Sequence, residues 1–311
     1  MAVLNPPRSL PALGRSIINF LTGSRTGSRR AWTEAELIEA FRPPGLNEDS
    51  SSAEGVAHTV YTFRAIGMLC SDTDGVITVS DTVAATGETL SPATFRRALQ
   101  RHALDLDRDG DPWQMGPGES LTGGARDLLR AMSWFLAQDA LGRPLSWTSG
   151  VQALQQAQFP DLDNETWAIT NDTRWGAVTR WGQALGLAAP PLVQPRSGLV
   201  PLPAMAINDV LDELPAGQMP IGDFLSQLAA KLPVLHGGLV RASLVTYLPG
   251  GDPDPGIAQN CADSSVGQAL RILQDRGRLV FDTLPDADGI RLSRFDSQRQ
   301  THVTLVRGGK R

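Results

Sequence analysis

The chain has 311 residues, enough for two or three domains of ordinary size, each with its own hydrophobic core. Its hydrophobic fraction of 41% and charged fraction of 20% are typical of globular proteins, and no apolar run reaches the ~20 residues that cross a bilayer. Composition therefore excludes a membrane-spanning chain and a wholly disordered one. The net charge of −5 argues against a uniformly basic protein that coats nucleic acid, but it permits a local basic surface.

The cysteines and the N-terminus bear on the cellular compartment. Cys70 and Cys261 lie far apart, and neither belongs to a CxxC motif or a Cys/His cluster, so we expect two reduced thiols. The N-terminus lacks the charged segment and long apolar segment of a secretion signal. These features predict a cytoplasmic protein with no membrane contact.

Three helices and a β-hairpin are predicted within the first 90 residues. Apolar residues recur at helical spacing over 10–21, and Thr33 with Glu36 forms a capping box that starts a second helix. Another capping box, Ser51 with Glu54, starts a third helix that ends at Gly67. The β-prone runs 68–70 and 76–79 flank an Asp-x-Asp-Gly turn. Three helices followed by a hairpin are the parts of a winged helix-turn-helix.

The end of the chain repeats this order. Helical spacing covers 206–214, 221–232 and 264–276, with a further helix at 239–248, and we expect a hairpin of 279–281 with 290–292 and one more strand at 303–306. The two units share a pattern with identical spacing: Val60, Phe63, Gly67 and Leu69 in the first, and Leu270, Leu273, Gly277 and Leu279 in the second. Such self-similarity predicts two winged-helix units.

Two interpretations of the middle of the chain remain open. Trp175, Val178, Trp181 and Leu185 form a helical stripe that ends at Gly186, and 199–200 would supply a returning strand, so this region resembles a degenerate third copy. The alternative is an all-helical domain built from 125–141, 151–157 and 172–185. In either case we expect its tryptophans to be core residues.

These elements define the predicted fold: a mainly α protein with small β-hairpins (α+β), in which tandem winged-helix units flank a helical middle domain. Segments rich in proline, glycine and aspartate mark the predicted domain boundaries. We predict an N-terminal winged helix over 1–90, a Trp-rich helical domain over 91–203 and a C-terminal winged helix over 204–311.

Motifs for catalysis or cofactor binding are scarce. Asp105, Asp107 and Asp109 resemble the first half of an EF-hand calcium loop, but Gly116 stands where the closing Glu is required, so a solvated acidic linker is favoured over a metal site. The sequence lacks the glycine-rich phosphate loops and the G-x-S-x-G elbow, and its four histidines are isolated. We therefore predict no enzymatic activity, no catalytic residue, no cofactor, no metal and no small-molecule substrate.

Arginine clusters are the candidate nucleic-acid contacts, because guanidinium groups bind phosphate oxygens in a bidentate manner. An ordinary solvated surface is the competing interpretation. Glu54 lies near the N-terminus of the first unit's third helix, the end that meets base edges, so the C-terminal unit is the better DNA-binding candidate. The candidate residues are Arg25, Arg29, Arg30, Arg96, Arg97, Arg101, Ser265, Gln268, Arg271, Arg276, Arg291 and Arg294.

Short motifs near both ends resemble the DpdG family. They are Val3-Leu4-Asn5-Pro6, the helix end 63–68, and the 279–292 hairpin followed by Thr301-His302-Val303. That family belongs to bacterial gene clusters that insert 7-deazaguanine derivatives into DNA and restrict unmodified DNA. The resemblance implies an accessory component of a phage-defence complex rather than the base-modifying enzyme, and it brings no catalytic residues with it.

Three functional hypotheses follow. The first is a non-catalytic winged-helix protein that binds DNA, scaffolds other proteins of a defence complex, or does both. The second is a transcription regulator that binds a palindromic site as a symmetric dimer. The third, which the sequence favours least, is a metal-dependent enzyme with its site at 105–111.

Overall fold

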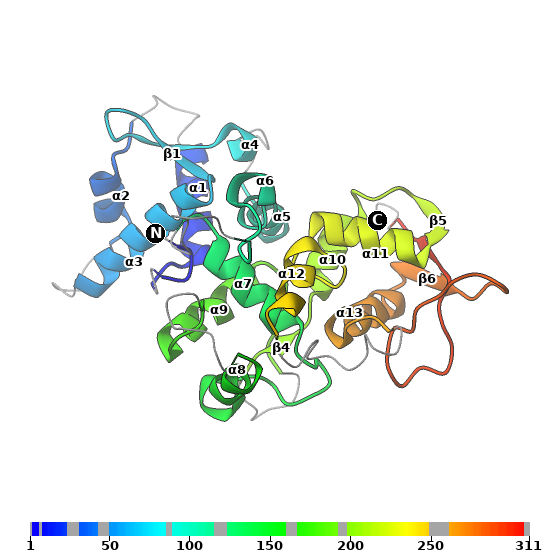
Figure 1. The fold of residues 1–311 in the computed structure, drawn as a ribbon. Coiled ribbons are helices and arrows are strands. Elements are labelled where there is room, and N and C mark those ends of the chain that lie inside the picture. The colour runs from blue at the N-terminus through cyan, green and yellow to red at the C-terminus, as the bar shows by residue number, and fades with distance from the viewer. Residues whose placement is uncertain are drawn as a thin grey trace.

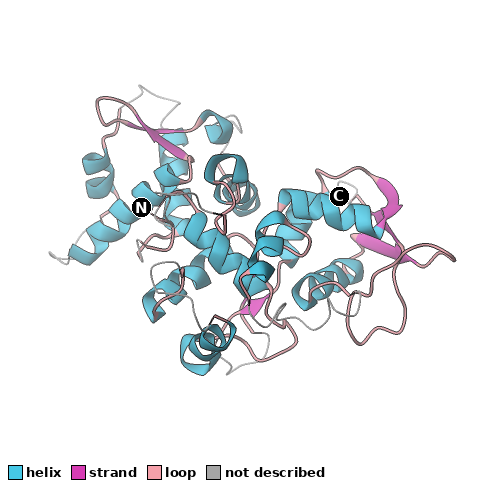
Figure 2. Cartoon of the chain, viewed as in Figure 1, coloured by secondary structure: helices cyan, strands magenta, loops and turns pink. Residues whose placement is uncertain are grey.

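The computed structural model describes residues 2–5, 8–23, 31–42, 50–84, 89–114, 123–159, 167–191, 198–248 and 261–307. Helices predominate, and the strands form small antiparallel sheets (Figure 2). The predicted α+β class is therefore confirmed. Figure 1 shows the blue N-terminal elements at one end of the molecule and the orange and red C-terminal elements at the other, with helix α7 between them.

The N-terminal unit, residues 11–79, contains three helices and a hairpin. Its elements are α1 (Pro11–Gly23), α2 (Glu34–Ala40), α3 (Ser50–Ala65), β1 (Leu69–Ser71) and β2 (Ile77–Val79). The predicted capping box at α2 is confirmed, because Thr33 and Glu36 each bond the other's backbone N–H. Thr33 also forms an antiparallel bridge with Val76, so a single-residue strand precedes α2 and pairs beside β2. Of the α3 capping box, Ser51 has a side chain outside the described residues.

Three short helices connect this unit to the next: α4 (Asp81–Ala84), α5 (Pro92–Ala103) and α6 (Leu106–Asp109). The middle unit, residues 126–201, follows. Its elements are α7 (Arg126–Leu136), the kinked turn η2 (Trp147–Val151), α8 (Gln152–Gln158), α9 (Asp172–Ala184), β3 (Ala188–Ala189) and β4 (Val200–Pro201). Strands β3 and β4 pair in antiparallel fashion, and Leu145 bridges Leu199. The all-helical alternative for this region is therefore wrong.

The C-terminal unit, residues 204–305, has the largest sheet, with strand order β5-β7-β6. Its elements are α10 (Ala204–Leu211), β5 (Gly217–Pro220), α11 (Ile221–Lys231), α12 (Leu239–Thr246), α13 (Ser264–Asp275), β6 (Leu279–Asp282) and β7 (His302–Leu305). The predicted pairing of 279–281 with 290–292 is wrong, because β6 pairs with β7. Leu292 is instead fully buried with its backbone against Gly267 of α13, where a Cβ atom would lie 1.7 Å from the Leu292 carbonyl oxygen.

The three units share one order: a helix, a short strand, helices, and two antiparallel strands of which the second pairs with the short strand. In each unit, the helix that precedes the antiparallel strand pair ends in the same way. Gly67, Gly186 and Gly277 have φ values of 72°, 72° and 67°, and the next N–H donates to a carbonyl five residues earlier at 2.9 Å. This is the Schellman motif, for which glycine is the preferred residue.

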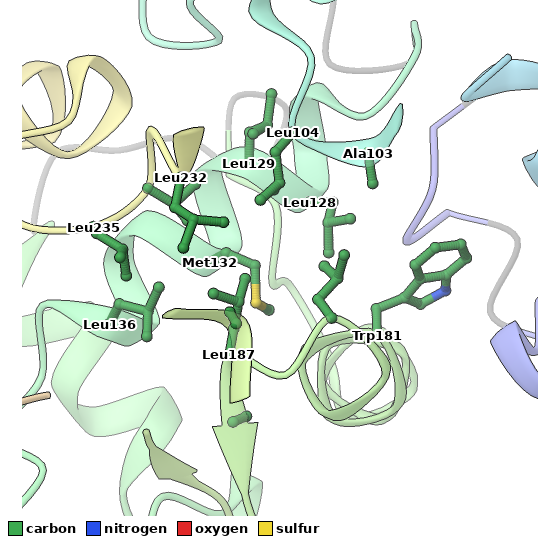
Figure 3. Packing of buried hydrophobic residues seen from close by; sticks show 14 of the residues in the cluster. Ala103, Leu104, Leu128, Leu129, Met132, Leu136, Trp181, Leu187, Leu232 and Leu235 are labelled. Atoms are coloured by element: carbon green, nitrogen blue, oxygen red, sulfur yellow. The ribbon is translucent and has the colours of Figure 1, made fainter. Parts of the chain in front are cut away.

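One hydrophobic core continues across the predicted boundaries at residues 90 and 203. The ring of Phe63 on α3 lies 6.1 Å from Phe95 on α5 and 5.9 Å from Trp181 on α9, measured between ring centroids. Figure 3 shows leucines from separate segments gathered around α7 and its Met132. Among the described tryptophans, five are buried, as predicted for core residues: Trp113, Trp134, Trp167, Trp175 and Trp181. No helix in the described part of the chain is long and apolar enough to span a bilayer.

The first residues of the chain are attached to α7 through one buried carboxylate. Asp127 accepts hydrogen bonds from the backbone N–H groups of Val3 (3.0 Å), Leu4 (2.7 Å) and Leu128 (2.8 Å). Burial raises the pKa of Asp127 to about 7, and the three N–H groups oppose this shift because they favour the charged form. The carboxylate therefore makes the attachment dependent on pH.

We predict that the contribution of the Asp127 carboxyl group to the free energy of unfolding falls as the pH rises from about 4 to about 7. The pKa in the folded protein lies above the ordinary value of 3.8, so the folded state binds more protons than the unfolded state across this interval. The free energy of unfolding of the wild type, minus that of Asp127→Asn, should fall over this interval and stay constant above it. Urea denaturation at a series of pH values measures this difference, and a difference independent of pH contradicts the prediction.

Candidate nucleic-acid and protein interface

The N-terminal end of α13, the predicted base-reading element, is buried against the end of α7. The hydroxyl of Ser265 donates to the Leu136 carbonyl at 2.7 Å and Ser265 is fully buried, while the hydroxyl of Ser264 accepts from the Ala140 N–H at 2.8 Å. Ser265 therefore has no surface to offer to a base. From the sequence, Ser265 is expected to be an exposed helix cap. Its hydrogen bond to Leu136 has no local signal, because the two residues lie 129 positions apart.

A buried ion pair fixes the segment that leads into α13. The carboxylate of Asp263 accepts from Arg241 Nε at 3.1 Å and lies 3.0 Å from His236 Nδ1. Asp263 is 1% exposed and the Arg241 side chain 3%, so neither is available to a ligand at the surface. The entry to α13 is thus fixed by α12 of its own unit and by α7 of the middle unit.

Four of the seven described candidate arginines contact carboxylates of another segment. Arg96 on α5 makes a bidentate pair with Asp209 on α10, including an Nη2 to Oδ1 distance of 2.9 Å. Nearby, Gln100 donates to the same carboxylate at 3.3 Å and to the Leu185 carbonyl at 2.8 Å. The Arg96 side chain is 16% exposed and that of Asp209 5% exposed. This group holds α5, α9 and α10 together.

Three further candidates are paired in the same way. Arg101 donates to Glu213 at 2.5 Å, Arg271 to Asp296 at 2.8 Å, and Arg294 to Asp139 at 3.0 Å. The Arg294 guanidinium also lies 5.0 Å from the ring centroid of Phe295. An acidic partner does not exclude a phosphate contact, but such a contact would have to compete with that partner.

The remaining candidates differ in exposure. Arg276 is exposed; Arg97, Gln268 and Arg291 are half-buried, and the Arg291 carbonyl accepts from the Ala262 N–H at 2.9 Å. Arg25, Arg29 and Arg30 lie outside the described residues. The side chains of Arg276 and of Arg299 are exposed in the C-terminal unit and make no ion pair within the described part of the chain.

The acidic segment 105–111 is structured rather than a solvated linker. Asp105 caps α6 by accepting from the Asp107 N–H at 3.1 Å, so its carboxylate serves the backbone. Asp109 is 6% exposed and binds Arg108 (2.6 Å) and the Ala125 N–H (3.0 Å). In the described ranges, no three His, Cys, Asp or Glu side chains gather as a metal site would require. An EF-hand loop requires its carboxylates to converge on one point, whereas those of Asp105 and Asp109 serve separate partners.

The residues that follow join the middle and C-terminal units. The Ser243 hydroxyl on α12 donates to Asp111 at 2.5 Å, and the Tyr247 hydroxyl donates to the Trp113 carbonyl. From the other side, Arg130 on α7 donates to the Pro112 carbonyl at 2.8 Å, and its guanidinium lies 4.6 Å from the Trp113 ring centroid. Burial lowers the pKa of Arg130 to about 10, so the group stays charged at neutral pH.

We predict that Asp209→Ala lowers the free energy of unfolding by on the order of 3 kcal/mol, because it leaves the largely buried Arg96 without its carboxylate and removes one of the two acceptors of Gln100. The matched control is Asp212→Ala, which removes the 54% exposed carboxylate that pairs with Arg278 and should cost less than about 1 kcal/mol. Equal losses in chemical denaturation of the two variants would contradict the role assigned to Asp209.

Comparison with known proteins gives one family. A family model described as DpdG-like matches residues 1–287 of the 311. Searches among curated proteins and among solved structures returned no significant match.

Proposed function

We propose that this chain, which belongs to the DpdG-like family, is a non-catalytic winged-helix component of a bacterial assembly that modifies and restricts DNA. In this role it brings other proteins of the assembly together and contacts DNA through its C-terminal unit. Membership of this family indicates a component of the Dpd defence cluster, the set of bacterial genes that inserts 7-deazaguanine derivatives into DNA. One observation supports the proposed scaffolding and DNA-contacting role: the same order of helices and strands occurs three times, and the three units share a single hydrophobic core.

The repeated order supports winged-helix units. A winged helix has a short strand after its first helix, and this strand pairs with the second strand of the hairpin that follows the third helix. The bridge of Thr33 to Val76, the bridge of Leu145 to Leu199, and the pairing of β5 with β7 occupy this position in the three units. The C-terminal unit adds α12 between its second helix and α13.

The surface chemistry supports DNA contact at the hairpin rather than at the start of α13. The α13 N-terminus is covered by α7, whereas Arg276 at the helix end and Arg299 in the β6–β7 connection are exposed. The same connection carries Phe295, which is 74% exposed. Exposed guanidinium groups can bind phosphates, and binding of this kind weakens as salt rises.

A scaffolding role is supported by the way the arginines are used. Arg96 and Arg294 form ion pairs between segments far apart in the chain, and this fixes the units relative to one another. Rigid placement of several units is what a platform for multiple partners needs, because binding then loses less conformational freedom.

We predict that Arg276→Glu and Arg299→Glu, singly and together, weaken binding of duplex DNA. Each variant should also reduce the slope of log K against log salt by about 1, since each removes one phosphate contact. Fluorescence anisotropy with a labelled duplex at several salt concentrations measures both quantities.

The matched control is Arg42→Glu in the N-terminal unit, which changes the charge equally and, among the described residues, removes the 3.8 Å pair with Glu39. It should bind DNA as the wild type does. A double variant that binds like the wild type, or a wild type that does not bind duplex DNA, would overturn the DNA-contacting role and leave protein scaffolding alone.

A further inference from the structure

The middle unit contains a cleft between the η2–α8 segment and residues 167–170. Its volume is about 130 Å³. This is well below the roughly 300 to 1,000 Å³ typical of pockets for drug-sized ligands, so it suits one small ring system. The lining residues are Trp147, Gln152, Gln155, Gln156, Phe159, Trp167, Ile169 and Thr170.

One wall of the cleft is aromatic and rigid. The ring centroids of Phe159 and Trp167 lie 4.7 Å apart, and both residues are less than 10% exposed. Behind them, Trp113 lies 6.3 Å from Phe159 and Trp134 lies 5.8 Å from Trp167. A wall supported by further buried rings changes shape little when a ligand arrives, which reduces the entropy lost on binding.

A third aromatic side chain comes from the kinked turn η2 that precedes α8. Trp147 is half-buried and lines the same cleft, yet among the described rings it has no ring contact with Phe159 or Trp167. The three aromatic residues therefore line one cleft without filling it.

The polar lining consists of neutral donors and acceptors. With its amide oriented to satisfy both neighbours, Gln155 donates to the Ile169 carbonyl at 3.1 Å and accepts from Trp167 Nε1 at 2.8 Å. The side chains of Gln152, Gln156 and Thr170 have no hydrogen bond within the described part of the chain. None of the lining residues is charged, so nothing in the cleft would neutralise a phosphate or carboxylate.

We propose that this cleft binds a single nucleobase. Its flat ring stacks on the aromatic side chains, and its polar edge bonds the glutamine amides, which present a donor and an acceptor side by side. The base comes from a free nucleoside or from a single strand, because a base stacked within a duplex cannot enter. This site is separate from the C-terminal arginines and stands independently of the duplex contact proposed above.

The test uses the full chain, with nucleosides in calorimetry and labelled single-stranded homopolymers of each base in fluorescence anisotropy. The wild type should bind at least one base. Trp147→Ala should weaken binding on the order of 10-fold through lost stacking, whereas Trp147→Phe keeps a ring and should retain most of the affinity. Gln156→Glu should weaken it several-fold, because a carboxylate lacks the amide donor.

The matched control is Gln183→Glu, an exposed glutamine on α9 outside the cleft, which should leave binding unchanged. Because Gln156 is exposed, Gln156→Glu remains informative even if Trp147→Ala does not fold. Binding by nucleosides identifies a free ligand, and binding by strands alone identifies a base within a strand; both support the proposal. The proposal would be overturned if neither nucleosides nor single strands bind, or if Gln156→Glu binds them with unchanged affinity. Binding of a proline-rich peptide in place of bases would also overturn it.

Discussion

The burial of helix α7 is the constraint on which the rest of the structure depends. From Asp127 to Leu136 every residue of this helix is buried, so it requires cover on all sides. The N-terminal segment covers its start through Asp127, and α13 covers its end through the bond of Ser265 to Leu136. Between them, Arg130 binds the segment around Pro112. The first residues of the chain, the segment around Pro112 and the C-terminal unit thus each contact α7 through a polar group that only the folded arrangement satisfies, because an unpaired buried polar group is costly.

This arrangement explains why charge patterning was a poor guide to the surface. Arginines clustered in sequence suggested a face for phosphates, but Arg96 and Arg294 reach carboxylates more than 100 residues away. The acidic segment 105–111, interpreted as a linker, contributes Asp109 and Asp111 to buried or bridging contacts. Within the described part of the chain, the paired arginines would have to leave their carboxylates to contact nucleic acid, whereas Arg276 and Arg299 of the C-terminal unit are exposed and make no ion pair.

Local signals made part of the fold predictable. The Thr33 capping box and the glycines Gly67, Gly186 and Gly277 report on a few neighbouring residues, and their helix ends lie where the sequence places them. The β6–β7 pairing was missed because about twenty residues separate the strands, and Leu292 between them is apolar for packing on α13. The aromatic cleft was also missed, because buried tryptophans look alike in sequence whether or not a gap lies beside them. Only the repeat of glycine and hydrophobic spacing indicated the common order of the units.

The central claim is that the three units form one cooperative body organised around α7. Differential scanning calorimetry of the full chain tests it most directly, because the calorimetric and van't Hoff enthalpies of unfolding agree when a protein unfolds in one step. The account predicts a single transition with equal enthalpies. Two or three separate transitions, or a calorimetric enthalpy well above the van't Hoff value, would show that the units unfold independently and would contradict it.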